Sequence, residues 1–573
     1  RPEVQRAVEA VRKVQVDAER LLADGTWPHY TAFDIGVLTK HDIGPLSRGQ
    51  LGRALARAEA DPSGPLGVLE ALPGPWRGAG SREARLDLLQ AQQASLLEQH
   101  FVFKVAEWQL EHGSRGLASN IAVPVVDRVG VGTGGHFRVR PRVIVADPGD
   151  AGRIARLHVR KEGNFEGALF DGVIATTDND HWRKQRAHLA EAFLPLSSLA
   201  AVLPTSLARA KQCAQRLAEA SRGGAEPVDM SDFLLHEAQA QLQLALLGAP
   251  EGFMEATNAQ LRATFAGDYE NTEAGVLGET MRALMDRASD PSFSLPSDGC
   301  PVRAPLSRAV ATSDFPPSTN YGNMLLTLFA GHDTTGHTMT WLIFELARHP
   351  AHQAELRREV DGFFCGLAGR EPEYRDLAHL PFLDRCITEV LRLWPAVASG
   401  TYRQLQFDDA VTGPDGRPVA LPRGTLVQIV NWSRHRNPDL WSADADHFNP
   451  HREFAPQELA RVGCPGAAIS PESERFSPFA HAPRTCLGRN FAQMEMRLIM
   501  VYLLSQFEFT LAPPYDSLQG ATFGAAPGTA DYHGLDVATM GPMDLERTTK
   551  HWWGERRYTG LKMFARPRET AAS

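Results

Sequence analysis

The sequence predicts a mainly α-helical fold with a large helical lobe and a smaller β-rich lobe. The first observation is an apolar segment at residues 318–349, long enough for a helix of about 30 residues. The second is that only two stretches, at residues 137–145 and 401–430, are short and rich in β-branched residues. The third is an ordinary globular composition over 573 residues, with 43% hydrophobic and 22% charged side chains.

The individual elements follow from local signals. A helix is expected at residues 81–99, and an Asp-Pro pair at residues 147–148 opens the next one. Residues 137–145 are interpreted as a β-hairpin or a pair of strands, and residues 401–430 as a β-rich patch. The remaining expectations are a turn at residues 413–416, an irregular segment at residues 516–554 and a closing strand at residues 560–563.

Two segments are expected along the chain. Residues 1–70 are interpreted as a helical N-terminal extension, and residues 71–573 as the catalytic domain. A Leu-Pro-Gly-Pro run at residues 72–75 suggests a linker between them. Within the extension, apolar side chains repeat near a 3.6-residue spacing over residues 4–22. A docked cap, a partner surface and a solvated helix without its own function all remain open.

Charge and cysteine content exclude some classes of protein. The net charge of -9 and the pI of about 6.1 argue against a nucleic-acid binder. No tract reaches the roughly 18 apolar residues of a membrane span. The six cysteines are sparse and lack CxxC pairs, which favours a reducing, cytoplasmic location. The sequence begins at Arg1, so a removed anchor or signal is left open.

The most informative stretch is Phe-Ala-His-Ala-Pro-Arg-Thr-Cys-Leu-Gly at residues 479–488. It places Cys486 just before a helix expected from Asn490 to about residue 504. The dipole and free N–H groups of a helix N-terminus favour a thiolate, which is the form that binds metals. Arg484 adds a positive charge, and Phe479 can shield the sulfur from water. A buried structural cysteine is the alternative interpretation.

A second unusual stretch lies in the middle of the long helix. Gly331, Asp333 and Thr334 interrupt apolar surroundings, which is locally unfavourable for a helix. Such a conflict is typical of functional sites, although a kink with a satisfied threonine would also explain it. Two helical pairs are weaker signals: Glu389 with Arg392, and Trp182 with Arg186. Each pair alone is typical of a surface contact.

Together these segments resemble the cytochrome P-450 family. The motifs are Trp-x-x-x-Arg, Ala-Gly-x-Asp-Thr-Thr, Glu-x-x-Arg, Pro-x-Arg-x-Phe around Arg452, and the cysteine loop, in the family's order. One position departs: Ala482 replaces the expected loop glycine, and Ala480 replaces another residue that is often glycine. A left-handed backbone would cost alanine roughly 1–2 kcal/mol there. The loop is therefore expected to be reshaped or to have its strain absorbed by neighbours.

The resemblance implies haem b (iron protoporphyrin IX) between the Asp333 helix and the Cys486 loop, with Cys486 as the iron ligand. It implies roles in proton delivery for Thr334 and Asp333, and room beside the haem at Gly331. It also implies a structural network that locks the cysteine loop, formed by Glu389, Arg392 and Arg452. The remaining cofactor-binding residues it implies are Trp182, Arg186 and Arg484 at the propionates, with Phe479 and Gly488 in the loop.

The implied function is monooxygenation: one atom of O2 enters an apolar, fatty-acid-like or natural-product substrate. Only 85 residues follow Gly488, too few for a reductase domain, so a separate ferredoxin or flavoprotein donor is expected. A Gly-x-Gly-x-x-Gly match at residues 130–135 runs into a strand and is interpreted as a turn. The alternatives are a peroxide-dependent or hydroperoxide-rearranging haem-thiolate enzyme and a non-catalytic haem sensor or binding protein.

Overall fold

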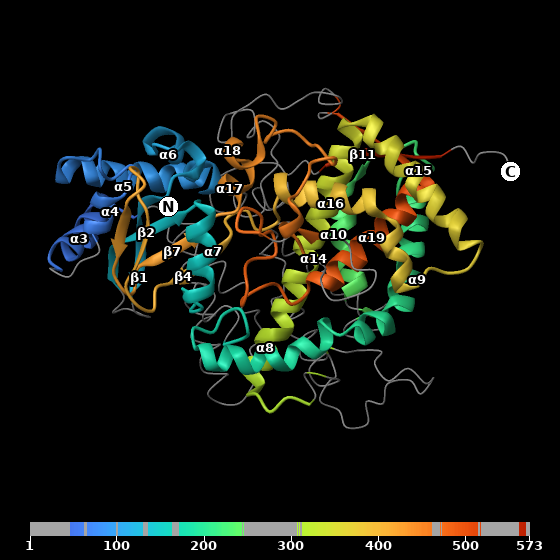
Figure 1. Ribbon diagram of the computed structural model, residues 1–573, viewed down its shortest axis with the longest axis horizontal. Helices are drawn as coiled ribbons and strands as arrows, with labels where there is room; N and C mark the ends of the chain where they lie inside the picture. Colours follow the sequence, from blue (N-terminus) through green and yellow to red (C-terminus); the bar gives the residue numbers. More distant parts are fainter. Residues whose placement is uncertain are drawn as a thin grey trace.

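The computed structural model describes eight continuous stretches of the chain and a few isolated positions between them. The stretches are residues 46–61, 66–98, 101–129, 136–162, 171–242, 312–460, 473–513 and 561–568. Figure 1 shows that they form a β-containing lobe, which includes the blue N-terminal helices, and a larger helical lobe. The predicted mainly α-helical fold with a small β-rich part is confirmed.

The β-containing lobe is built on a four-stranded sheet. Its order is β1 (Ile121–Val129), β2 (His136–Val145), β7 (Leu426–Ile429) and β4 (Thr401–Gln404). All neighbours are antiparallel except β2 and β7, which are parallel. The prediction of a hairpin within residues 137–145 is wrong: this stretch is one strand, and its hairpin partner β1 precedes it. Residues 130–135 lie outside the described residues.

Three helices pack with this sheet: α3 (Arg48–Glu59), α4 (Leu66–Ala71) and α5 (Arg82–Glu98). Their apolar side chains share one buried cluster with β1, β2 and β7, in which Leu51, Leu55 and Leu69 are fully buried. Residues 46–71 therefore belong to the β-containing lobe by packing. The predicted division at residue 70 stays a prediction, and the expected helical stripe at residues 4–22 lies outside the described residues.

The Leu-Pro-Gly-Pro run does not behave as a free linker. It is buried, and the N–H of Ala122 in β1 donates to the carbonyl of Pro73 at 2.9 Å. Gly74 has a φ of 152°, and a Cβ there would lie 2.2 Å from the carbonyl oxygen of Ala122. Only glycine fits this close approach of two backbones. The run thus extends the packed edge of the sheet.

The helical lobe surrounds α14 (Pro317–Arg348), which confirms the long helix expected at residues 318–349. It packs against α10 (Met230–Leu242), α16 (Pro381–Leu393) and α19 (Arg489–Gln506). In this core, the rings of Trp341 and Trp394 stack at a centroid distance of 3.8 Å. The other helices are α6 (Phe101–His112), α7 (Pro148–Leu157), α8 (Asn179–Phe193), α9 (Leu196–Ala220), α15 (Pro350–Leu367), α17 (Trp432–Arg436) and α18 (Pro438–Trp441).

Small sheets complete the described structure. The expected closing strand is confirmed as β11 (Lys562–Pro567), which lies between β10 (Phe507–Leu511) and β3 (Val228–Asp229). The expected turn at residues 413–416 joins β5 (Asp409–Thr412) to β6 (Pro418–Leu421), and β8 (Leu459–Ala460) pairs with β9 (Ser470–Pro471). Among the described residues, no single helix has the length and apolar character to cross a membrane. The bent pair of α8 and α9 meets that test only jointly.

Candidate functional site

The cysteine loop leads directly into α19. The N–H of Cys486 donates to the carbonyl of Phe479 at 2.9 Å, which closes the loop. Gly488 is the N-cap of α19, with a φ of -80° and a ψ of 3°. A Cβ at Gly488 would lie 4.0 Å from the Cys486 sulfur, an ordinary contact distance. Phe479 is partly buried against the core, and the Arg489 guanidinium lies 5.4 Å from its ring centroid.

The thiol of Cys486 does not ionise as easily as its position in the sequence suggests. Its pKa is raised, with burial as the largest cause. Hydrogen bonds from the backbone N–H groups of Gly488 and Arg489, and the charges of Arg186 and Arg489, oppose this rise. The expected effect of the helix N-terminus is present, but desolvation outweighs it in the protein alone. A metal cation at the sulfur would reverse the balance.

The backbone strain of the loop falls on Ala480. This residue has a φ of 63°, in the left-handed region that favours glycine. Ala482, at the position of the expected motif glycine, has no positive φ. The N–H of Ala480 donates to the carbonyl of Ser477 at 3.0 Å, which helps to hold this conformation. The left-handed backbone expected in this loop therefore occurs at Ala480 and not at Ala482.

Buried cations gather beside the loop. Arg484 donates from Nε to the Val159 carbonyl at 3.1 Å and from Nη1 to the Val173 carbonyl at 3.3 Å. Its Nη2 is buried without a hydrogen-bond partner among the described residues, as are Nε and Nη2 of Arg403 on β4. Burial lowers the pKa of Arg484 to about 9 and that of Arg403 to about 10. Burial, followed by the charges of Arg403 and Arg484, lowers the pKa of Lys161 far below its usual value.

These groups point to a site for anions. The charges that shift the pKa values of Lys161 and Arg484 are other cations, and burial alone shifts that of Arg403. Lys161 and Cys486 keep some solvent-accessible surface, although burial is the main cause of both pKa shifts. Buried cations with free N–H donors are costly unless a negatively charged group joins them. The arrangement suits carboxylates presented by a ligand.

Helix α8 brings its predicted pair to the same loop. The guanidinium of Arg484 lies 4.0 Å from the ring centroid of the buried Trp182. Arg186 donates from Nη1 to the carbonyl of Thr485 at 2.7 Å. Trp182 thus stacks on one cation, and Arg186 fastens the residue before Cys486. The helix is positioned locally by Asp178, whose side chain accepts hydrogen bonds from the N–H groups of its first turn.

The structure brings Glu389, Arg392 and Arg452 together. Arg392 donates from Nη2 and Nε to the two Glu389 oxygens at 2.7 and 2.9 Å. Arg452 donates from Nε to Glu389 Oε1 at 3.1 Å and from Nη1 to Asp444 Oδ1 at 2.9 Å. Glu389 and Arg392 are buried, so each charge depends on its partners.

A short chain of hydrogen bonds links this network to the cysteine loop. Arg392 Nη1 donates to the carbonyl of His435 at 2.8 Å, and Nε2 of His435 accepts from the N–H of Ser477 at 3.1 Å. Ser477 in turn accepts from Ala480, as described above. Burial, together with the charges of Arg434 and Arg392, lowers the pKa of His435 far below its usual value, so its ring is neutral and can accept. The sequence did not indicate His435 or Ser477, because neither belongs to a recognisable spacing.

The predicted residues of the long helix lie near its centre. The Thr334 hydroxyl donates to the carbonyl of Ala330 at 2.8 Å, within its own helix. A Cβ at Gly331 would lie 1.9 Å from Cδ1 of Leu242, so the glycine gives space to α10. The expected room beside a haem at Gly331 stays a prediction. Nothing is described of the Asp333 side chain, so its predicted role also stays a prediction.

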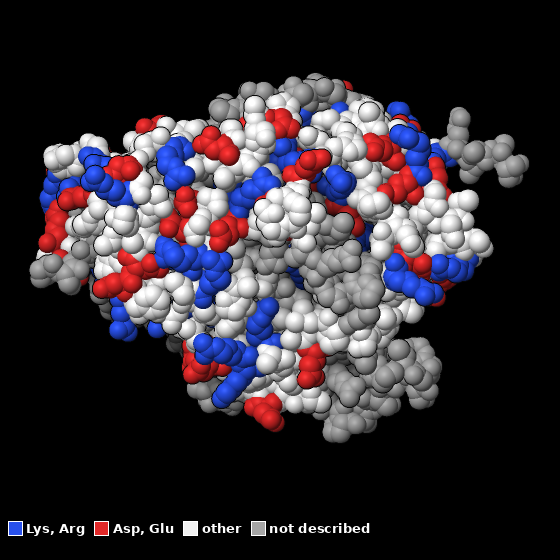
Figure 2. Space-filling model, in the orientation of Figure 1, with Lys and Arg blue, Asp and Glu red and all other residues white. Residues whose placement is uncertain are grey.

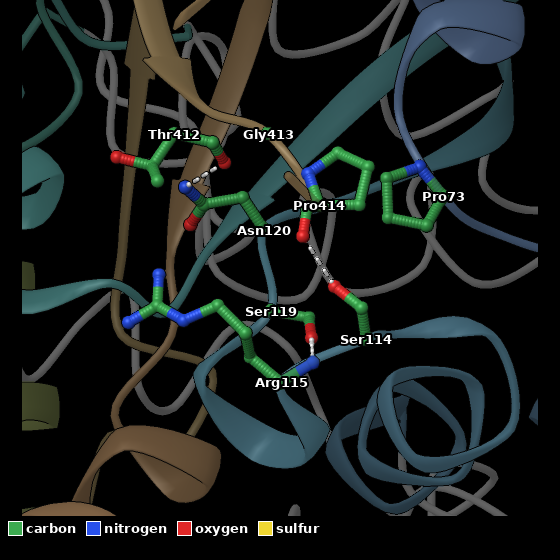
Figure 3. Close-up of a pocket in the computed structure, with 8 residues that line it drawn as sticks. All are labelled: Pro73, Ser114, Arg115, Ser119, Asn120, Thr412, Gly413 and Pro414. Atoms are coloured by element: carbon green, nitrogen blue, oxygen red, sulfur yellow. Dashed lines mark hydrogen bonds between the residues drawn. The ribbon is translucent and has the colours of Figure 1, made fainter. Parts of the chain in front are cut away.

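Figure 3 shows a separate small pocket at the edge of the β-containing lobe. Its polar groups are already paired: Ser114 Oγ donates to the Pro414 carbonyl at 2.8 Å, and Asn120 Nδ2 to the Thr412 carbonyl at 3.0 Å. None of the candidate site residues lines it; its lining is Pro73, Ser114, Arg115, Ser119, Asn120, Thr412, Gly413 and Pro414.

Known proteins match the part of the chain that runs from α14 to the cysteine loop. Residues 319–526, which include most of α14 and the cysteine loop, match the family model described as Cytochrome P450. This part of the chain is therefore similar to the cytochrome P450 family. The fold agrees: a crystal structure of a cytochrome P450 (CYP102L1) matches with a TM-score of 0.54 and 21% identity, over 77% of this chain and 91% of that one.

Three curated relatives of this chain match over part of their length. Sterol 26-hydroxylase, mitochondrial, of Oryctolagus cuniculus is 31% identical over 39% of each chain. Cytochrome P450 4F2 of Homo sapiens is 37% identical over 31% of this chain and 32% of its own. Leukotriene-B4 omega-hydroxylase 3 of Mus musculus is 37% identical over 31% of each chain. The matched part thus spans between about a third and two fifths of these relatives.

P450s carry haem b, and the residues present here fit that cofactor. Cys486 offers the sulfur ligand, and the buried cations Lys161, Arg403 and Arg484 offer N–H donors to two propionates. Lys161 was missed by sequence reasoning because a lone lysine between Arg160 and Glu162 carries no motif.

Proposed function

We propose that this chain is a haem-thiolate monooxygenase that inserts one atom of O2 into an apolar organic substrate and reduces the other to water. The observation that carries the proposal is the placement of Cys486, just before α19, on the same loop as Arg484, whose charge acts on Lys161 and whose pKa is lowered by burial and by Arg403. Haem bound there supplies the redox chemistry that activates O2. The reaction requires two electrons and two protons from outside the substrate.

The residues of the chain divide this work. Cys486 would hold the iron, Arg484, Arg403 and Lys161 would hold the propionates, and Trp182 orients Arg484 by stacking on it. Arg186 fixes the loop through the Thr485 carbonyl. The network of Glu389, Arg392 and Arg452 keeps the loop in place through the neutral His435 ring. These roles set the geometry without taking part in proton transfer.

Proton delivery is assigned to the centre of α14. The Thr334 hydroxyl donates to Ala330 in the structure, and rotation about its Cα–Cβ bond frees this proton. Asp333, one residue earlier in the sequence, is the acid that replenishes it. The buried surroundings of α14 limit water entry, so protons pass through side chains and water does not flood the site. Because Gly331 has no side chain, α14 can pack closely against Leu242 of α10 at this point.

The substrate and electron donor are further parts of the proposal. The printed names of two relatives refer to hydroxylation of a sterol and of a leukotriene, which supports an apolar, fatty-acid-like substrate. A natural-product substrate is the second candidate. The donor is a separate ferredoxin or flavoprotein. Figure 2 shows basic side chains over α8, beside acidic ones, and Arg183 and Lys184 are exposed there for an acidic partner. A cytoplasmic location stays a prediction.

Turnover in labelled oxygen tests the proposal. The holoenzyme is incubated with medium-chain fatty acids under ¹⁸O2, with NADPH and a ferredoxin or flavoprotein reductase system. Product that carries one ¹⁸O atom, formed only with reductant, supports monooxygenation. Product formed with hydrogen peroxide alone would indicate the peroxide-dependent alternative, and tight haem without turnover would indicate a sensor. Thr334→Ala should increase peroxide release per electron consumed, since it removes the proton donor; unchanged coupling would refute that role.

A further inference from the structure

Three metal-ligating side chains meet on the surface of the helical lobe, away from the cysteine loop in sequence. They are His352 and Glu355 on the first turns of α15, and His451, which follows Pro450. One potential ligand atom from each lies within 4.8 Å of the other two. We propose that these three side chains form a binding site for a divalent transition-metal ion of the zinc type.

The positions follow from local structure. His352 and Glu355 are three residues apart on a helix, which places them on one face. His451 is held opposite them because its N–H donates to the Asn449 side chain at 3.1 Å, while the N–H of Asn449 donates to Glu389 at 3.1 Å. His451 is thus positioned through Asn449 by the buried carboxylate of Glu389.

The distances are close to those that a metal requires. Glu355 Oε2 lies 3.2 Å from His451 Nε2 and 3.9 Å from His352 Nδ1. Two ligands on a tetrahedral ion with bonds of about 2.0–2.1 Å lie roughly 3.3 Å apart. The Glu355–His451 pair therefore matches, and the Glu355–His352 pair needs a small rotation of a partly exposed side chain. Two imidazoles and one carboxylate suit zinc, nickel or copper better than the oxygen-preferring magnesium or calcium.

Two neighbouring side chains adjoin the site without taking part in it. The aromatic ring of Phe448 backs the site, with its centroid 6.0 Å from that of His352. His349 is a less suitable ligand, because its Nδ1 is 2.8 Å from the Glu345 carbonyl and is engaged there.

The consequence of binding would be mechanical. A metal ion on His352, Glu355 and His451 would tie α15 to the segment that carries Arg452. That segment contacts Glu389, so the ion would stabilise the folded state of the network beneath the cysteine loop. A ligand that binds only the folded protein raises its unfolding temperature.

The test is calorimetric titration of the untagged holoenzyme with ZnCl2, alongside thermal unfolding with and without Zn²⁺. We expect one site, lost or weakened at least about tenfold in His352→Ala and in Glu355→Gln. The control is His379→Ala, an exposed histidine on the 3₁₀ helix Tyr374–His379. Zn²⁺ should raise the unfolding temperature of the wild type and the control only.

Three results would overturn the proposal: no binding up to millimolar Zn²⁺, equal affinity in all variants, or equal loss in the control. Glu355→Gln has nearly the same shape as the wild type and keeps the test valid if the histidine variant folds poorly. The carbon monoxide spectrum of each variant verifies that its haem site is intact. Because the readout is Zn²⁺ affinity, failure here would leave the proposed oxygen chemistry untouched.

Discussion

Replacing Ala480 by glycine should stabilise the cysteine loop, although it removes a side-chain carbon from the protein. Ala480 has a φ of 63°, where the Cβ of an L-residue crowds the following carbonyl. Relief of that crowding contributes about 1–2 kcal/mol. The added flexibility of glycine in the unfolded chain offsets about 0.4–1 kcal/mol of the gain. The net expectation is stabilisation by about 0–1.6 kcal/mol, with a central value of ~0.8 kcal/mol.

Ala482→Gly is the matched control for this prediction. Ala482 lies two residues away in the same loop and has no positive φ, so glycine relieves nothing there. The unfolded-state cost then acts alone, and this variant should lose about 0.4–1 kcal/mol. The two variants remove the same methyl group and are predicted to have opposite signs.

The assay is guanidinium unfolding of the holoenzyme, followed by the haem absorbance and by far-ultraviolet circular dichroism. Ala480→Gly should raise the midpoint, Ala482→Gly should lower it, and the slopes should agree with that of the wild type. If both variants lowered the midpoint equally, Ala480 would not carry left-handed strain. A midpoint raised by Ala482→Gly and not by Ala480→Gly would show that residue 482 carries the strain instead.

Three further predictions concern other parts of the molecule. Lys161→Met removes one of the cations beside the cysteine loop and should speed haem transfer to an apoprotein acceptor about tenfold. The control variant Lys211→Met, at a surface ion pair, should leave the transfer rate unchanged. Gly336→Ala would place a Cβ 2.8 Å from the Leu235 backbone and should destabilise the folded protein by about 1–3 kcal/mol. An unchanged midpoint of thermal unfolding would refute the close packing of α10 and α14. Burial raises the pKa of Asp384 to about 6, despite the neighbouring Arg497. The folded protein therefore binds this proton more tightly than the unfolded chain does. Stability should fall by up to about 3 kcal/mol as the pH rises from about 4 to 6. Asp384→Asn should flatten this part of the stability profile, and an unaltered slope would assign it to other groups.

Sequence reasoning succeeded where the pattern was long or the motif carried its own chemistry. The helix at α14 follows from more than 30 residues of sustained apolar character that end at a proline. The meeting of Glu389, Arg392 and Arg452 was foreseen only because three weak signals occurred in a known order. Alone, each pair would have been taken for a surface contact. Helix α19 likewise followed from the loop before it and an apolar run.

The failures have physical causes. Residues 137–145 were predicted to form two strands. The pattern of side chains along a strand does not show where its partner lies, and the partner here is β1, which comes earlier in the chain. The run at residues 72–75 looked like a linker because proline and glycine are common to loops and to tight edges of sheets. Lys161 and His435 were missed because their importance arises from burial beside distant cations, and burial is a property of the fold. The strain at Ala480 depends on a backbone angle that its residue type disfavours.

The central claim is that Cys486 binds haem iron through a thiolate, and one spectrum tests it most directly. The dithionite-reduced protein is measured with and without carbon monoxide, beside Cys486→Ala. The account predicts a strongly red-shifted haem band in the wild type that is lost in the variant. A band at the position of histidine-ligated haem, or a spectrum unchanged in Cys486→Ala, would contradict it.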